Sequence, residues 1–180
     1  KSQMPIKVVF SREDDMTAGT YRPAVKYNMK VAIKDNKITG YHVKEAAISD
    51  NMYDLIPNFF PAGSIENYRV DIASYPSNIS TGAFRAPHTN FHAVAEQSFF
   101  DKVAEHLEIS PVKLKIDLLQ KVKGNTDDRQ LFSAERLEGV INLVTEKSGY
   151  GNASNGASQG FSSYFCHNTH VAQVADVEMV

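Results

Sequence analysis

The sequence predicts an α+β fold in which a hairpin-rich antiparallel sheet packs against about three helices. Apolar and polar residues alternate on both sides of the turn Asp35-Asn36-Lys37, which is typical of a β-hairpin. The middle of the chain instead carries apolar residues at helical spacing, between residue types that begin and end helices. Strands come first and helices follow, and this order favours an α+β fold over an alternating α/β fold.

The first half of the chain is predicted to form strands joined by loops. An apolar run at residues 6–10 predicts a short buried strand, and residues 11–22 predict a charged loop. Residues 24–34 and 38–48 form the two arms of a long hairpin. The apolar side chains of the first arm fall on one face: Val25, Tyr27, Met29, Val31 and Ile33.

Residues 49–63 contain two prolines and a glycine, which predict a loop. Its aromatic side chains, Phe59 and Phe60 among them, are expected to be exposed and to pack the loop on itself. Residues 68–75 then return as a strand that Pro76 ends.

Three helices are predicted to follow. The first spans about residues 88–107, and the second begins at Ser110-Pro111, an N-cap followed by the residue type favoured at the first helical position. Ser133 caps the third helix and Gly149 ends it. The side chains expected to point inward are Phe91, Val94, Ala95, Phe99, Val103 and Leu107 in the first helix, and Leu137, Val140, Ile141 and Val144 in the third.

The composition excludes some classes of function. With a formal net charge of −2, the chain has no basic field that attracts nucleic acid, so nucleic-acid binding is disfavoured. Cys166 is the single cysteine of the sequence, whereas an iron–sulfur cluster needs several thiolates. Any such cluster therefore lies on another polypeptide. A Gly-, Asn- and Ser-rich stretch at residues 149–160 predicts a flexible connector.

The segment from Ser80 to His88 is the strongest functional candidate. Arg85 stands among Gly82, Ala83 and Ala86, so the backbone can approach a bulky ligand while the guanidinium offers a planar set of donors. The segment leads into a helix, whose first N–H groups and dipole favour negative charge. These features suit an anionic or oxo-bearing cofactor. A plain turn whose arginine makes a surface ion pair is the simpler alternative.

Four motifs follow one another along the chain: Arg12-Glu13-Asp14-Asp15-Met16, then Tyr21-Arg22-Pro23, then Gly82-Ala83-Phe84-Arg85-Ala86, and then a helix with Glu96 and Asp101. The order and the residues of these motifs resemble those of the molybdopterin-binding subunit of the xanthine dehydrogenase and aldehyde oxidoreductase family. The first two motifs are most similar to the isoquinoline 1-oxidoreductase beta-subunit group of bacterial enzymes. The strand pair from Gly160 to Glu178 resembles the one that opens the next cofactor-binding region of such subunits.

The resemblance implies a fold like that of a molybdenum-cofactor-binding domain and assigns roles to seven residues. The cofactor-binding loop is Ala83, Phe84, Arg85 and Ala86, and the substrate pocket includes Pro87, His88 and Arg22. Xanthine-type relatives carry an aromatic residue at the position of Pro87, so a purine-like specificity is in doubt. The match of Arg22 is weaker, because its spacing from Met16 is one residue short. None of these residues is expected to bind the metal directly.

The resemblance also implies the reaction and its partners. Such subunits oxidise aldehydes or N-heterocycles with oxygen derived from water. They use a molybdenum-pterin cofactor, here expected in the cytosine dinucleotide form, and pass electrons to an iron–sulfur partner subunit or domain. The family's base, a glutamate in a Gly-x-Gly-Glu motif, has no counterpart in this sequence.

The chain is therefore expected to be an inactive fragment that binds no cofactor alone. It is expected to expose apolar patches near Phe59, Phe60 and the terminal strands, or to cover them in a homodimer. The family's organisation divides the fragment into a cofactor-binding subdomain at residues 1–150, and a connector with the start of the next region at residues 151–180.

Two alternatives come from other classes of function. His88, His92 and Glu96 lie at i, i+4 and i+8, and two imidazoles with a carboxylate can hold the zinc of a hydrolase. Because the third ligand is two turns from the first, an ordinary polar helix face is the simpler interpretation. The other alternative is a non-catalytic interaction domain, in which Phe84 and the loop with Phe59 and Phe60 contact another protein.

Overall fold

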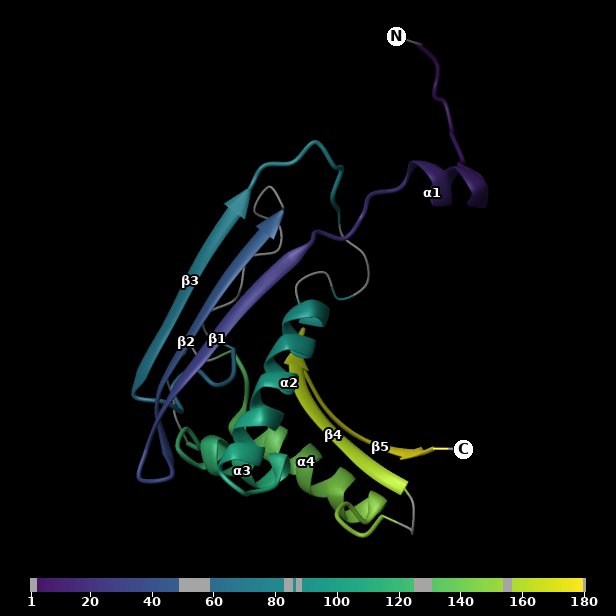
Figure 1. The fold of residues 1–180 in the computed structure, drawn as a ribbon. Coiled ribbons are helices and arrows are strands. Elements are labelled where there is room, and N and C mark those ends of the chain that lie inside the picture. The colour runs from purple at the N-terminus through teal and green to yellow at the C-terminus, as the bar shows by residue number, and fades with distance from the viewer. Residues whose placement is uncertain are drawn as a thin grey trace.

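A computed structural model describes residues 3–48, 59–82, 86, 89–124, 131–153 and 157–179. Over these residues the order is one helix, three strands, three helices and two strands, which confirms the α+β fold. Figure 1 shows a three-stranded sheet on one side of the molecule, helices beside it, and a β-hairpin beyond helix α2. No helix within these ranges is long and apolar enough to cross a membrane.

The predicted hairpin is present as β1 (Val25–Lys34) and β2 (Lys37–Ile48), which pair antiparallel. Asp35 and Asn36 between them both have positive φ, 50° and 54°, as a tight two-residue hairpin turn requires. Burial alternates along β1, with the predicted apolar face turned toward the core. The local alternation and the turn residues therefore determine this part of the fold.

The third strand, β3 (Asn67–Tyr75), pairs with β2 in parallel and gives the sheet order β1-β2-β3. The alternation of apolar residues predicted the strand itself. It carries no information on direction, because both directions place alternate side chains on one face.

The helices are α2 (Thr89–His106), α3 (Pro111–Gln120) and α4 (Ala134–Ser148). Their predicted caps are confirmed: the Ser110 hydroxyl accepts from the Lys113 N–H at 3.1 Å, and the Ser133 hydroxyl accepts from the Arg136 N–H at 3.2 Å. Gly149 ends α4 in the left-handed conformation, with φ 62°.

The buried face of α2 differs from the prediction. Val94, expected to point inward, is 68% exposed, whereas His92 and Glu96 are buried along with Phe100 and Val103. The expectation that His92 and Glu96 lie on a polar helix surface was therefore wrong. A lysine of α3 supplies the charge that makes this burial possible, and nothing local to α2 signals it.

The last two strands, β4 (Ala157–Cys166) and β5 (Thr169–Glu178), form a hairpin that packs mainly on α4. Phe161 and Phe165 of β4 belong to the common hydrophobic core. Residues 157–160, predicted as part of a flexible connector, pair with β5 and are strand. Their Gly- and Ser-rich composition is overridden because β5 extends far enough to pair with them.

Phe59 and Phe60 are not exposed. They retain only 8% and 5% of their accessible surface, and their rings contact Phe165, Phe100 and Phe132. The prediction of an apolar surface patch at these two residues was wrong, because a loop can place its aromatic side chains in the core between sheet and helices. This burial also removes the protein-contact role suggested for them.

The N-terminal part of the chain lies apart from this core. Residues 6–10 form no strand, and their apolar side chains are exposed, for example Ile6 at 69% and Phe10 at 70%. The predicted loop at residues 11–22 contains helix α1 (Arg12–Ala18), which Ser11 and Asp14 cap reciprocally. Figure 1 shows α1 and the N-terminal segment standing away from the remaining elements. An apolar run becomes a buried strand only when another strand pairs with it.

Candidate functional site

Two motifs that are far apart in the sequence meet through their backbones. Tyr21 and Thr81 form an isolated parallel β-bridge. The Tyr21 N–H donates to the Ser80 carbonyl at 2.9 Å, and the Gly82 N–H donates to the Tyr21 carbonyl at 3.0 Å. The structure thus holds the Tyr21-Arg22-Pro23 motif against the start of the predicted cofactor-binding loop.

Of the seven predicted site residues, the structure describes Arg22 and Ala86. Arg22 is half-buried and directly follows the bridge, and Ala86 is exposed with a positive φ of 53°. A residue with a Cβ atom rarely adopts this left-handed conformation. The other five predicted residues lie outside the described part of the chain: Ala83, Phe84, Arg85, Pro87 and His88.

The far end of the predicted loop is tied to the β4–β5 hairpin. Thr89 begins α2, and its buried hydroxyl donates to the Cys166 sulfur at 3.4 Å. Cys166 Sγ in turn lies 2.6 Å from Nδ1 of His167, which is in the turn after β4. Figure 1 shows the arrowhead of β4 beside the start of α2. Segments on both sides of the loop are therefore fixed by distant parts of the chain.

A buried charged cluster lies further along α2. The Lys115 ammonium from α3 donates to Glu96 Oε1 at 2.9 Å, and both side chains are almost fully buried. His92 Nε2 lies 3.7 Å from the other oxygen of Glu96. The ammonium also sits 3.8 Å from the centroid of the Phe60 ring, a favourable cation–π distance.

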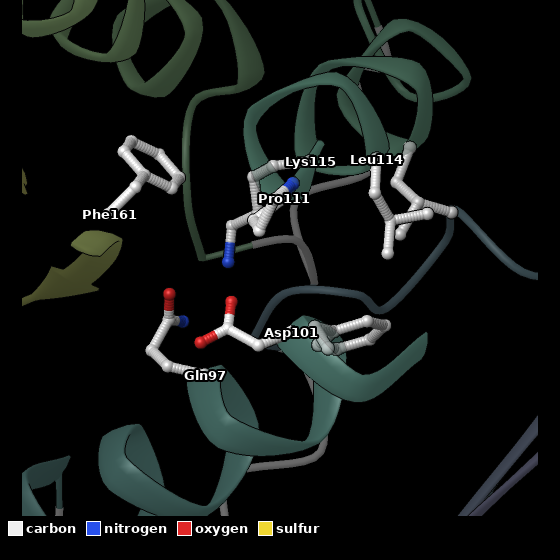
Figure 2. A pocket seen from close by; sticks show the side chains of 8 residues that line it. Gln97, Asp101, Pro111, Leu114, Lys115 and Phe161 are labelled. Atoms are coloured by element: carbon white, nitrogen blue, oxygen red, sulfur yellow. The ribbon is translucent and has the colours of Figure 1, made fainter. Parts of the chain in front are cut away.

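Gln97 connects this cluster to β4. Its Nε2 donates to Glu96 Oε1 at 3.0 Å, and its Oε1 accepts from the Ser163 N–H at 3.2 Å. Figure 2 shows the Lys115 side chain extending from α3 toward Gln97 and Asp101 of α2. The small cavity among these residues is about 10 Å³, at the lower limit for one water molecule.

The electrostatics of the cluster favour a neutral His92. Burial, followed by the nearby Lys115 ammonium, lowers the pKa of His92 to about 4. Burial also raises the pKa of Glu96, although Lys115 opposes that shift. Tyr27 and Tyr164 flank the imidazole, with ring centroids 5.5 and 6.4 Å away, and burial raises the pKa of both phenols. The cluster is thus a structural network whose charges are matched inside the core.

The zinc alternative receives no support from this geometry. Across the described ranges, no three His, Cys, Asp or Glu side chains gather closely enough to hold a metal ion. One Glu96 oxygen is bonded to an ammonium, which opposes a second cation there. His88, the third proposed ligand, lies outside the described residues.

The sequence reasoning missed Lys115 and Thr20. Lys115 falls among Leu114, Leu118 and Leu119, which form the buried stripe of α3, and this position was a usable signal for a buried charge. Thr20 carried no such signal. It lies against Gly82 only because of the bridge described above.

Comparison with known proteins adds a family and a fold. Residues 1–117 match the family described as molybdopterin cofactor-binding domain. Among solved structures, the chain is similar to quinoline 2-oxidoreductase from Pseudomonas putida 86, with a TM-score of 0.54 and 13% identity. That match covers 78% of this chain and 21% of the other, so the chain spans about a fifth of its neighbour's length. At this identity the likeness shows a shared fold. No curated protein matches the sequence.

Proposed function

The chain belongs to the molybdopterin cofactor-binding domain family, and from that premise we propose that it is part of the large subunit of a molybdenum hydroxylase or dehydrogenase. The family match over residues 1–117 carries this proposal, since it includes both segments that the Tyr21–Thr81 bridge joins. The similarity to the fold of an oxidoreductase supports it.

The proposed reaction is oxidation of an aldehyde or an N-heterocycle with oxygen from water. The proposed cofactor is the cytosine dinucleotide form of the molybdenum-pterin group. Because the sequence has a single cysteine, iron–sulfur clusters that accept the electrons belong to a partner subunit or domain. The 180-residue chain alone is proposed to be inactive, because it contains no Gly-x-Gly-Glu motif for the base.

The described residues around the loop are compatible with a large anionic group. Ala86, within the predicted loop, presents a left-handed backbone with a small side chain. The 18-residue helix α2 begins shortly after, so its N-terminal N–H groups favour negative charge nearby. A non-glycine residue in this sparsely populated conformation, such as Ala86, is a recurrent feature of ligand-binding sites.

We assign the residues of this chain to binding and orientation. Ala83, Phe84, Arg85 and Ala86 contact the cofactor, which when bound supplies the redox chemistry. The Arg85 guanidinium donates hydrogen bonds to oxygen that gains negative charge during the reaction. Pro87, His88 and Arg22 are proposed to line the substrate pocket.

Substitution of Arg85 in the full-length enzyme tests the proposal. Loss of one preorganised donor to developing charge costs about 3 kcal/mol in the barrier, so Arg85→Ala should lower turnover roughly a hundredfold or more. Arg85→Lys keeps the charge but loses the planar set of donors, and it should be impaired as well. Steady-state kinetics should be measured together with molybdenum and pterin content and circular dichroism.

Arg136→Ala is the matched control, because Arg136 is an exposed arginine on α4. It should leave turnover unchanged. Near-normal turnover of both Arg85 variants at full molybdenum loading would refute the assignment of the loop. One equivalent of zinc without molybdenum would instead favour the hydrolase, and neither metal would favour an interaction domain.

A further inference from the structure

The bridge between Tyr21 and Thr81 brings Gly82 unusually close to Thr20. A Cβ atom built on Gly82 would clash with the Thr20 hydroxyl oxygen and would lie 2.7 Å from Thr20 Cβ and 3.0 Å from Thr20 Cγ2. Contacts below 3.0 Å essentially never occur for real Cβ atoms. No residue other than glycine therefore fits at position 82 without movement.

The requirement for glycine here is spatial. Gly82 does not have a positive φ, unlike Gly124, Gly149 and Gly151, so an L-residue meets no backbone penalty of that kind. Rotation of the Thr20 side chain can move its hydroxyl and methyl groups. It cannot move Thr20 Cβ, which is fixed to the backbone. The conflict with a larger residue at position 82 thus lies between two backbone segments.

We propose that Thr20 and Gly82 are positioning residues: their close contact fixes where the loop that starts at Ala83 leaves the bridge. This inference rests on the proposed role of residues 83–86 in binding the cofactor. The Gly82 N–H donates a hydrogen bond to the Tyr21 carbonyl, and Gly82 also packs against Thr20. Both interactions fix the position of Gly82. A larger residue at position 82 pushes the start of the loop away from residues 20–22.

The size of this movement sets the expected effect. Thr20 Cβ and a new Cβ at position 82 must separate from 2.7 Å to an ordinary contact distance. A displacement of roughly 1 Å in a positioning element costs on the order of a hundredfold in rate. Because neither Thr20 nor Gly82 is part of the hydrophobic core, the fold should tolerate the same displacement.

The test uses the full-length enzyme with four variants: Gly82→Ala, Thr20→Gly, and Gly82→Ala combined with either Thr20→Gly or Thr20→Ala. Gly82→Ala should lower kcat by roughly a hundredfold at unchanged molybdenum content and unfolding midpoint. Thr20→Gly removes the Cβ atom and should restore kcat in the double variant to within about threefold of Thr20→Gly alone. Thr20→Ala keeps that Cβ atom and should not restore it.

Gly139→Ala and Gly160→Ala are matched controls, because a Cβ atom at either position meets nothing within 4 Å. Both should retain normal kcat. Wild-type kcat in Gly82→Ala would overturn the inference. Failure of Thr20→Gly to restore activity, or equal restoration by Thr20→Ala, would overturn it too.

If Gly82→Ala does not load molybdenum, the inference is tested by the two double variants. Molybdenum loading and turnover must return when Thr20→Gly is added to Gly82→Ala and must not return when Thr20→Ala is added. Arg85→Ala, measured in the same series, separates this inference from the proposed function. A normal Gly82→Ala with an impaired Arg85→Ala overturns the positioning role alone. Normal turnover in Arg85→Ala overturns the proposed function.

Discussion

The helical core and the N-terminal segment differ in how their residues are held. In α4, Leu137 and Ile141 are 1% and 0% exposed, whereas α1 has no buried residue and Tyr21 is 70% exposed. The segments joined by the Tyr21–Thr81 bridge depend on a few backbone hydrogen bonds, whereas the core depends on side-chain packing. Stability and the proposed site therefore reside largely in different parts of the chain.

This separation has a physical consequence for mutations. Substitutions in the core remove packing or leave a charge unpaired, so they should unfold the protein. Substitutions near the bridge disturb few buried contacts and should leave it folded with an altered site.

Lys115→Met should destabilise the chain by about 3–5 kcal/mol, because it leaves the buried Glu96 carboxylate without its partner. Urea unfolding of the 180-residue chain measures this change. Glu96→Leu combined with Lys115→Met removes both charges and should recover most of the loss. If Lys115→Met lowers the free energy of unfolding by less than about 1 kcal/mol, the Lys115–Glu96 ion pair contributes little to the stability of the core.

His92 should make stability depend on pH. Its folded pKa of about 4 lies below the ordinary 6.5, so between these values the unfolded chain binds a proton that the folded chain does not. The contribution of neutral His92 to the free energy of unfolding is complete above pH 6.5. It decreases by about 3 kcal/mol as the pH falls from 6.5 to about 4.

His92→Phe removes the titrating group and keeps a ring between Tyr27 and Tyr164. The difference in unfolding free energy between this variant and the wild type should therefore vary with pH between 4 and 6.5. A difference that stays constant across this range would show that His92 is not buried in its neutral form.

Two of the serine N-caps, Ser133 and Ser11, allow the core and the N-terminal segment to be compared by the same substitution. Ser133 and Ser11 each accept a hydrogen bond from the third helical N–H, but α4 is packed in the core and α1 is not. Ser133→Ala should cost about 1 kcal/mol in global stability, whereas Ser11→Ala should cost nothing measurable in denaturant unfolding. Equal losses in the two variants would show that α1 belongs to the cooperative core.

The sequence predicted those features of the fold that local chemistry determines. The turn at Asp35 and Asn36 and the caps at Ser110, Ser133 and Gly149 depend on neighbouring residues, and the structure confirms all of them. The prediction of a buried strand at residues 6–10 was wrong, because burial of such a segment depends on a partner strand. The parallel direction of β3 likewise depends on long-range pairing.

The buried face of α2 shows the same limit. Glu96 is stable inside the core because Lys115, 19 residues away on another helix, approaches it within 2.9 Å. At the candidate site, the sequence identified the two motifs by resemblance, but not the bridge between Tyr21 and Thr81 that joins them. The Thr20–Gly82 contact follows from that bridge and could not be predicted separately.

Amide hydrogen exchange on the full-length enzyme, with and without molybdenum cofactor, tests whether the Tyr21–Thr81 bridge borders the cofactor site while the core lies apart from it. Two amides report on the site, Tyr21 N–H and Gly82 N–H, and the Leu137 N–H of α4 reports on the core. We predict that cofactor loading slows exchange at Tyr21 and Gly82 by roughly tenfold or more and leaves Leu137 unchanged. Equal exchange at Tyr21 and Gly82 in the loaded and unloaded enzyme would show that the bridge does not border the cofactor site.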